Sequence, residues 1–340
     1  MRPSFHPRLV NGRMGDPCVY LEVLHQPDAI LLDCGDLSAL SARHLLKIGT
    51  LAVSHAHLDH WAGFDQLLRV LVGRERRIDV VGPEGFAARL HHRLQAYTWN
   101  LVDRIPADLV FTVTEVTAGA AWSRARMRLH RAFASEQLAP MPAGPIVLRS
   151  GQVRLGAAVL DHGTPCLGFV LQEEAHYNVW RNRLDQRGLP AGPWLAGLKH
   201  ALAAGRPDDF PVPIFARAAA AEAAPTRPLS ALRDLVAVTR GQRVAYLTDF
   251  EDTEANRETA IALARNADLV FIEAPFLSAD AAIARGRQHL TARAAGEIAR
   301  AAAVRRIEPF HFSLRYAGRE EQLLGEVAAF AGPDCVAPLR

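Results

Sequence analysis

The sequence predicts a layered α/β fold. Short apolar runs recur along the chain, and several of them end in histidine or aspartate before a turn or a helix-like pattern begins. The composition agrees, because 340 residues of which 49% are hydrophobic provide material for a sizeable core. Chains of this class and length often form one domain, so we expect residues 1–340 to be a single domain.

Charge and cysteine content restrict the class of protein further. The formal net charge of +3 permits a polyanionic partner without requiring one. No apolar run approaches membrane-spanning length, and the first ten residues, MRPSFHPRLV, lack the apolar core of a signal peptide. The four cysteines form no C-x-x-C pair, which favours free thiols in a soluble cytoplasmic protein: Cys18, Cys34, Cys166 and Cys335.

The first elements lead to the most informative stretch. Residues 18–24 and 29–33 have the pattern of two paired strands, and the second strand ends at Asp33. Residues 40–48 resemble a short helix that precedes the next strand.

Residues 51–63, LAVSHAHLDHWAG, combine an apolar run, four ligand-type side chains and the start of a helix pattern that continues over residues 61–72. His55 and His57 are two positions apart, so both imidazoles can point to one side of extended backbone. Asp59 and His60 follow after a turn and can face a second position. Nitrogen and carboxylate ligands suit a divalent ion such as zinc. A polar loop with hydrogen-bonded histidines is the alternative, but four such residues within six positions favour a metal site.

The H-x-H-x-D-H pattern of residues 55–60 at a strand end resembles the signature of the metallo-β-lactamase superfamily. The resemblance implies a four-layer αββα sandwich and a metal-dependent hydrolase. Later stretches resemble the ribonuclease Z branch of this superfamily in particular. In the superfamily an aspartate at the position of Asp33 lies behind the metal ligands, although a simple turn-forming aspartate remains an alternative.

The middle of the chain continues the pattern. Residues 78–81 and 111–116 are expected to be strands, with a helix over residues 86–97 between them. The strand-like run 153–160 delivers His162 before the turn GTPCLGF, which repeats the arrangement at His55. In ribonuclease Z a metal-binding histidine ends a strand and precedes a Gly-aromatic pair. Residues 168–169, Gly-Phe, match that pair and imply that His162 is a ligand.

Residues 176–199 depart from the sandwich pattern. The stretch 188–199, GLPAGPWLAGLK, is too rich in proline and glycine for a regular element at its start and then favours a short helix. It resembles the Gly-Pro motif of the ribonuclease Z exosite, a protruding arm that grips the body of a tRNA, and we place the arm at residues 176–200. An ordinary surface excursion is the alternative. The low-complexity stretch 217–227 is expected to be a connection or a short exposed helix.

Two further strands carry carboxylates at their ends. Residues 243–249 end in Asp249, which lies where the family has its metal-bridging aspartate, although the family's Gly-Asp-Thr is here Thr-Asp-Phe. After a helix pattern over residues 254–266, the strand 268–273 resembles the family's His-Glu-Ala-Thr box. In this box Glu273 is retained, whereas Ile272 replaces the histidine and Pro275 the threonine.

The last motifs are two histidines. His289 precedes a helix that Thr291 can cap, where the family has a catalytic histidine, and a polar residue of a helix-leading loop is the alternative. His311 follows the strand pattern of residues 306–312, and its sequence HFSLRY reproduces a metal-binding histidine with the serine and the Arg-Tyr pair of ribonuclease Z.

Together the resemblance implies a binuclear site and its chemistry. Zinc is the favoured metal, with manganese or iron as alternatives. Asp59 would orient or deprotonate a water molecule, and His289, held by Glu273, would stabilise charge on the phosphoryl group or protonate the leaving oxygen. The expected activity is that of an endoribonuclease that processes the 3′ ends of precursor tRNA, commonly as a homodimer. The expected ligands are His55, His57 and His162 for one ion, Asp59, His60 and His311 for the other, and Asp249 as a bridge.

One departure leaves the substrate open. Many ribonucleases Z have a P-x-K-x-R-N loop after the first strand, which senses the CCA sequence. Residues 10–17, VNGRMGDP, contain Arg13 but neither the lysine nor the Arg-Asn pair. The alternatives are therefore a hydrolase of a smaller phosphodiester or another ester, and a catalytically silent, metal-stabilised nucleic-acid-binding protein.

Overall fold

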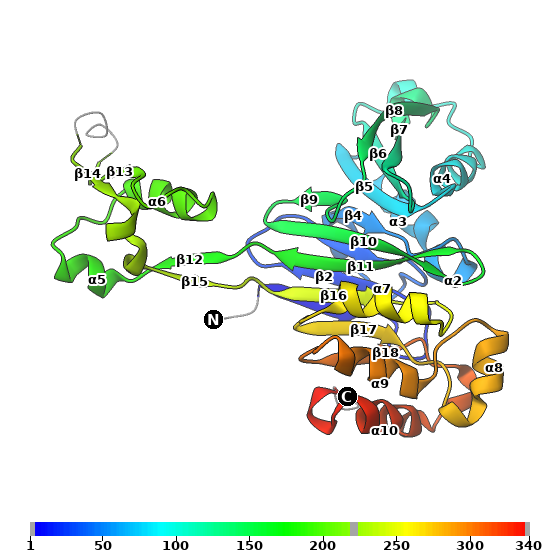
Figure 1. Cartoon of the computed structure of the whole chain (residues 1–340). Coiled ribbons are helices and arrows are strands. Elements are labelled where there is room, and N and C mark those ends of the chain that lie inside the picture. The colour runs from blue at the N-terminus through cyan, green and yellow to red at the C-terminus, as the bar shows by residue number, and fades with distance from the viewer. Residues whose placement is uncertain (1–3, 218–223, 337–340) are drawn as a thin grey trace. The chain divides into compact units, whose positions relative to one another are not determined.

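The computed structural model describes residues 4–217 and 224–336. The chain forms two compact units, which we call the main unit (Met1–Gln172 and Gln242–Arg340) and the inserted unit (Glu173–Gly241). Figure 1 shows the helices and strands of both. Part of the low-complexity stretch 217–227 lies outside the described residues.

Two sheets form the centre of the main unit. The first has eight strands in chain order: β1 (Phe5–Leu9), β2 (Val19–Val23), β3 (Ala29–Leu32), β4 (Ile48–Ala52), β5 (Arg76–Pro83), β6 (Leu109–Val116), β7 (Ala121–Arg128) and β8 (Ser135–Pro142). Its strands β3 to β6 are parallel. The second sheet has six strands in the order β18 (Ile307–Phe310), β17 (Leu269–Glu273), β16 (Arg243–Leu247), β11 (Pro165–Glu173), β10 (Val153–Asp161) and β9 (Leu148–Ser150).

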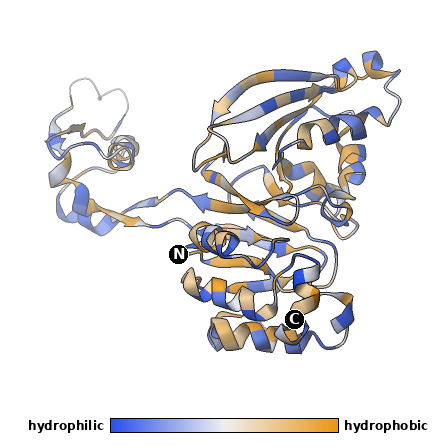
Figure 2. Ribbon diagram, turned by 45° about the vertical axis from the view of Figure 1, so that its right-hand side comes forward, coloured by the Kyte–Doolittle hydropathy of each residue, from blue (hydrophilic) through white to orange (hydrophobic). Residues whose placement is uncertain are grey.

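Helices cover the outer faces of both sheets. The helices packed on the first sheet are α1 (Ala42–Lys47), α3 (Phe64–Leu71) and α4 (Phe86–Gln95), and those packed on the second are α7 (Glu254–Ala264), α9 (Ala292–Ala301) and α10 (Glu320–Ala331). In Figure 1 the short helices α2 (Leu58–Trp61) and α8 (Ala281–Gly286) lie toward the right-hand ends of the strands. Figure 2 shows polar and apolar residues alternating along several of these elements, as expected where one face is buried.

Three buried apolar clusters correspond to the three interfaces between these layers. One joins α1, α3 and α4 to the first sheet, through residues such as Leu45, Phe64, Leu90 and Phe111. Another lies between the sheets and includes Leu21, Leu32, Phe169 and Phe271. The last joins α7, α9 and α10 to the second sheet and includes Val270, Ile298 and Val327. The expected four-layer αββα sandwich is therefore confirmed.

Most elements lie where the sequence predicted them, but one expected helix begins later. The helix expected over residues 61–72 is α3, which starts at Phe64, whereas Trp61 is the last residue of the separate short helix α2. A Cβ atom at position 63 would lie 2.2 Å from the carbonyl oxygen of Gly35, and the Gly63 amide donates to the Cys34 carbonyl at 2.9 Å. This close approach of two backbones excludes a side chain and ends the first helix early.

The inserted unit has its own core. It contains β12 (His176–Val179), α5 (Arg181–Gln186), α6 (Trp194–Ala203), β13 (Pro211–Pro213), β14 (Thr226–Pro228) and β15 (Val236–Thr239). The strands β12 and β15 pair antiparallel, as do β13 and β14. Leu184, Trp194 and Leu198 are buried against Leu229 and Leu235. Because these partners lie beyond residue 200, the compact unit extends well past the arm expected at residues 176–200.

Within that unit the glycine-proline stretch behaves as its composition suggested. Residues 188–193 form no helix or strand, and α6 begins at Trp194. Gly192 lies so close to the backbone of Phe215 that a Cβ atom would be 2.3 Å from its carbonyl oxygen.

All four cysteines are free thiols, and Cys18, Cys34 and Cys166 are buried. None of the helices in the described ranges has the length and apolar composition needed to cross a bilayer.

Candidate metal centre

The expected donor side chains lie at strand ends or just after them. In the first sheet, β4 leads to His55 and His57, and the following helix α2 carries Asp59 and His60. In the second sheet, β10, β16, β17 and β18 lead to His162, Asp249, Glu273 and His311. Because β16, β17 and β18 are parallel, their carboxyl ends meet at one edge, which brings residues far apart in the chain together.

Three donor groups are compact enough to hold a metal ion, since in each of them one ligand atom from every residue lies within 4.8 Å of the others. The first is His55, His57, His162 and Asp249, and the second is Asp59, His60 and His311. The third, Asp249, Glu273, His289 and His311, shares Asp249 with the first and His311 with the second. In the second group, Asp59 Oδ2 is 3.6 Å from His60 Nε2 and 3.4 Å from His311 Nε2. The structure thus brings together all seven residues that the sequence nominated as ligands.

Asp249 lies between the first two groups. Its Oδ2 is 3.6 Å from His55 Nε2 and 3.7 Å from His162 Nε2, both of the first group. The same oxygen is 3.2 Å from His60 Nε2, and Oδ1 is 2.9 Å from His311 Nδ1. A carboxylate in this position can contact ions in both groups.

Unpartnered nitrogens support a metal at this place. His55 Nε2, His60 Nε2 and His311 Nδ1 are buried and have no hydrogen-bond partner among the residues that the structure describes. A buried polar atom without a partner is costly, and a cation would satisfy the two Nε2 atoms. The opposite nitrogens of these two rings are already used, since His55 Nδ1 is 3.1 Å from Ser54 Oγ and His60 Nδ1 is 2.8 Å from Asp33 Oδ2. His162 Nδ1 is likewise 2.8 Å from the Gln288 carbonyl. Such partners orient ligand histidines, so the donor set fits divalent metal ions.

Asp33 lies behind the ligand histidine His60 in the buried part of the site. Its fully buried carboxylate accepts from the Ser54 amide at 2.6 Å, from Ser54 Oγ at 2.8 Å and from the Tyr246 hydroxyl at 2.7 Å, in addition to His60. Ser54 and Tyr246 are site residues that sequence reasoning missed. The hydroxyl of Ser54 directly before His55, and a tyrosine inside the apolar run that ends at Asp249, were the available signals.

Backbone conformation distinguishes three of these residues. Asp33, Asp249 and His311 have φ values of 54°, 49° and 59°. Residues other than glycine seldom adopt this left-handed region, and they concentrate at functional sites where surrounding structure holds them. Asp33 and His311 directly follow the last residues of β3 and β18, and Asp249 comes two residues after the end of β16. The turn at each strand end thus directs the side chain across the sheet edge.

Charges in the site are strongly coupled. Burial and then the neighbouring His60 lower the pKa of His55 to about 2. Burial opposes charge on His60 too, but the Asp249 and Asp33 carboxylates outweigh it and raise its pKa to about 10. Burial likewise acts to raise the pKa of Asp249, whereas His311 and His60 hold it well below its ordinary value. Buried carboxylates here require positive charge, which protons on the rings or bound cations can supply.

His289 lies beside the first two donor groups and is held by Glu273. Its Nδ1 is 2.7 Å from Glu273 Oε2, while Glu273 Oε1 accepts from the amides of Phe250 and Leu290. The His289 ring centre is 4.9 Å from that of His162 and 5.5 Å from that of His311. Burial acts to lower the pKa of His289, but Glu273 outweighs it and raises this pKa. Ile272, which replaces the family's histidine, is buried in the outer core on the other face of β17 and leaves this arrangement intact.

A cleft of about 300 Å³ leads to the donor groups. Asp59, His289 and His311 line it together with residues 14–17 and 312–314. The loop 10–17 does not direct its arginine into this cleft, because Arg13 Nε is paired with Glu308 at 2.7 Å. Asp16 lines it instead, and burial together with the nearby Asp59 raises the pKa of Asp16.

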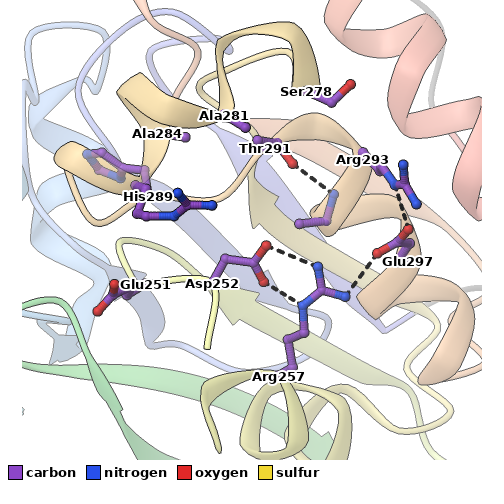
Figure 3. Close-up of a pocket in the computed structure, with 12 residues that line it drawn as sticks. Glu251, Asp252, Arg257, Ser278, Ala281, Ala284, His289, Thr291, Arg293 and Glu297 are labelled. Atoms are coloured by element: carbon purple, nitrogen blue, oxygen red, sulfur yellow. Dashed lines mark hydrogen bonds and ion pairs between the residues drawn. The ribbon is translucent and has the colours of Figure 1, made fainter. Parts of the chain in front are cut away.

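A second cavity of about 400 Å³ is also lined by His289 (Figure 3). Arg257 crosses it and binds Asp252 and Glu297, and Arg293 also binds Glu297 at 2.8 Å. Its charged lining is thus largely paired internally.

In comparisons of sequence, no family model matches the chain. The chain is nevertheless 35% identical to a ribonuclease Z of Deinococcus radiodurans over 292 residues, which cover 84% of this chain and 83% of that protein. A ribonuclease Z of Thermobifida fusca is 35% identical over 244 residues, 68% of this chain and 69% of the relative.

In comparisons of structure, the chain resembles the metallo-β-lactamase fold protein YhfI of Bacillus subtilis, with a TM-score of 0.54 and 14% identity over 95% of this chain and 92% of that one. It also resembles the short form of human tRNase Z, with a TM-score of 0.50 and 16% identity over 92% and 93% of the two chains. At these identities the likenesses show the fold.

Proposed function

The chain belongs to the ribonuclease Z family, and we propose that it is a metal-dependent phosphodiesterase that cleaves precursor tRNA at the 3′ end. The observation that carries this proposal is the position of Asp249 between two donor groups, at the edge of a sandwich whose relatives are ribonucleases Z. Donor groups of this kind suit hydrolysis of a phosphodiester, in which negative charge develops on phosphoryl oxygens.

The metal ligands are assigned from the first two groups. His55, His57 and His162 would hold one ion, Asp59, His60 and His311 would hold the other, and Asp249 would contact both. We favour zinc because nitrogen and carboxylate donors in this number suit it, with manganese and iron as alternatives. When bound, two such ions activate water and neutralise charge on the substrate phosphate. About two equivalents of metal per chain are therefore expected.

Two side chains would orient water or move a proton. The Asp59 carboxylate lines the cleft, and the hydrogen bond from His311 and the charge of His60 outweigh the effect of burial and lower its pKa to about 2. As an anion it can orient a water molecule, a role that fits so low a pKa better than accepting the proton. Glu273 fixes His289 through Nδ1, so that Nε2 is available to donate to the leaving 3′ oxygen or to a phosphoryl oxygen.

The inserted unit supplies the proposed contact to the body of a tRNA. It carries the glycine-proline stretch of the ribonuclease Z arm, with Arg181 and Lys199 exposed on α5 and α6. We regard the chain as one metallo-β-lactamase-fold domain into which this unit is inserted. Family resemblance supports a homodimer, and free thiols together with a tRNA substrate support a cytoplasmic location.

The loop 10–17 suggests that the protein discriminates poorly between different 3′ ends of its substrate. Arg13 is paired with Glu308, and the carboxylate of Asp16 faces the cleft where basic side chains would favour phosphate. We therefore propose relaxed positional choice at the 3′ end and poor rejection of transcripts that already carry CCA.

Cleavage of a precursor tRNA with mapped ends tests the function. The expected products are a mature tRNA with a 3′-hydroxyl and a trailer with a 5′-phosphate, and activity should require added divalent metal after chelation. Hydrolysis of bis-p-nitrophenyl phosphate without cleavage of any RNA, under each of the three metals, would instead identify an esterase of smaller substrates.

A further inference from the structure

An exposed leucine stands at the mouth of the catalytic cleft. Leu314 is 76% exposed, and only Leu58, at 78%, is more exposed among the large apolar side chains that the structure describes. Leu314 lines the cleft that contains Asp59 and His311, and Leu58 directly precedes Asp59 in the chain. Single exposed leucines are common on protein surfaces, but both of the most exposed ones adjoin the donor groups.

The turn that carries Leu314 is firmly held. Residues 314–316 form a 3₁₀ turn, in which the Ser313 hydroxyl accepts from the Arg315 amide at 3.4 Å. Tyr316 is buried, and its hydroxyl bonds to the Leu277 amide at 3.2 Å and to Asp280. Because Tyr316 is anchored inward, Leu314 is presented outward in a fixed position, so that little order is lost when a partner binds it.

The walls of the cleft suit the flat face of a base. Met14 and Pro275 line it beside Leu314, and Arg287, also in the lining, has its guanidinium carbon 6.0 Å from the Phe276 ring centre. Apolar surface next to a cation fits a nucleotide, whose base is apolar on its faces and whose phosphate is an anion. The cleft volume of about 300 Å³ lies at the small end of ligand sites.

We propose that Leu314 forms the contact surface of a subsite for one nucleobase next to the scissile phosphate. This inference rests on the proposed function, since it requires a single-stranded RNA end in the cleft. Unpaired bases at RNA ends are commonly held by stacking on side chains. Leucine has no hydrogen-bonding group, so it holds a base without reading its identity, and a purine, having the larger face, is held better than a pyrimidine.

The test combines protein and substrate changes. Leu314→Ala and Leu314→Met are compared with wild type on a precursor tRNA and on versions with an abasic nucleotide at either position beside the cut. Leu101→Ala is the matched control, because Leu101 is also exposed and lines neither cavity. Leu314→Ala should lower kcat/KM about 5- to 20-fold, as expected when part of a leucine side chain is buried on binding, while Leu314→Met and Leu101→Ala stay near wild type.

The abasic substrates decide the interpretation. At one of the two positions, removing the base should cost wild type a similar factor and cost Leu314→Ala nothing further, since both changes remove the same contact. Two results would overturn the subsite and leave the proposed function standing. One is an equal decrease in kcat/KM on every abasic substrate, and the other is an unchanged kcat/KM of Leu314→Ala on a precursor tRNA that wild type cleaves. Failure of wild type to cleave RNA would overturn both.

Discussion

The main and inserted units differ in what they bury. The main unit buries several polar side chains: Asp33, His55, His60, Asp249 and Glu273 are all nearly inaccessible. Among them Asp33 bonds to His60, while Glu273 bonds to His289. The inserted unit buries a small apolar cluster, and the basic side chains of its α5 helix pair locally at the surface. None of the donor groups found among the described residues lies in the inserted unit. Chemistry and recognition of a large substrate are therefore expected to be separable.

The largest effect is expected from Asp249→Ala. This change removes the carboxylate that contacts both donor groups and leaves His55, His60 and His162 facing one another without it. Metal content should fall, and hydrolysis of both RNA and bis-p-nitrophenyl phosphate should drop on the order of 10³-fold or more, the scale of losing an essential member of a catalytic group. Metal analysis and turnover of both substrates are the measurements.

Asp252→Asn provides the matched control. Asp252 is a partly exposed carboxylate near Asp249 in the chain whose partner is Arg257. Exposed pairs contribute little to stability, so this variant should retain metal and activity. If Asp249→Ala binds and turns over as wild type does, its assigned position between two ions is wrong.

His289→Ala should separate proton transfer from metal binding. The ring is held by Glu273 and is proposed to be no ligand, so metal content should remain while the rate falls about 10²- to 10⁴-fold, the usual contribution of a general acid. The reduction should be smaller for an activated nitrophenyl ester, whose leaving group needs no proton. Loss of metal equal to that of His311→Ala would show that ligand and catalyst have been confused.

Removal of the inserted unit should affect RNA alone. Deleting only residues 176–199 would remove β12, leave its partner β15 unpaired and expose Leu229 and Leu235. The deletion must therefore include the whole inserted unit. Gln172 pairs with Arg243 across β11 and β16, and a two-residue Asn-Gly turn in place of residues 174–241 would close these strands as a hairpin.

The shortened protein should cleave precursor tRNA on the order of 10² times more slowly, the scale of losing a few phosphate contacts, and show a weaker dependence on salt. Hydrolysis of bis-p-nitrophenyl phosphate should stay within about 2-fold of wild type, since a small diester needs only the cleft. An equal decrease for both substrates in a well-folded protein would contradict the separation of the two units.

Sequence nominated the donor residues through the H-x-H-x-D-H pattern of residues 55–60 and, for His162, Asp249 and His311, through the resemblance to ribonuclease Z. Strand order explains why some of them meet, because β16 and β18, which precede Asp249 and His311, run parallel with β17 and have their carboxyl ends at one edge. The later start of the helix expected over residues 61–72 was missed because the break at Gly63 depends on a backbone contact with Gly35, far away in the chain. The extent of the inserted unit was missed because residues 226–239 contribute short strands and 3₁₀ turns without a recognisable period.

Contacts between the two sheets were also beyond sequence reasoning. Tyr246 lies on β16 of the second sheet, and Asp33 follows β3 of the first. The alternation of side chains along a strand predicts the face of the sheet on which a residue lies, but it does not predict which residue of the other sheet it contacts. The hydroxyl of Tyr246 thus could have been an isolated polar group at the rim of the core. In the structure it is a donor to the carboxylate beneath His60.

Tyr246→Phe should produce the smallest of these effects, and it tests whether the buried polar network of the main unit tunes the metal. The substitution keeps the ring in the core and removes one of the four hydrogen bonds that Asp33 accepts. Loss of a bond to a buried carboxylate should lower the free energy of unfolding by about 1.5–3 kcal/mol. Because Asp33 orients His60, metal affinity should also fall, by about 10-fold, the low end for partners of ligand histidines. Urea unfolding of the metal-free protein measures the stability, and competition with a chromogenic chelator measures the metal affinity.

Tyr20→Phe is the control, since the Tyr20 hydroxyl bonds to Glu22 at 3.1 Å on β2, away from the donor groups. Should the two variants change chelator competition equally, the link from Tyr246 through Asp33 to the metal would be refuted, and the hydroxyl would contribute to folding only.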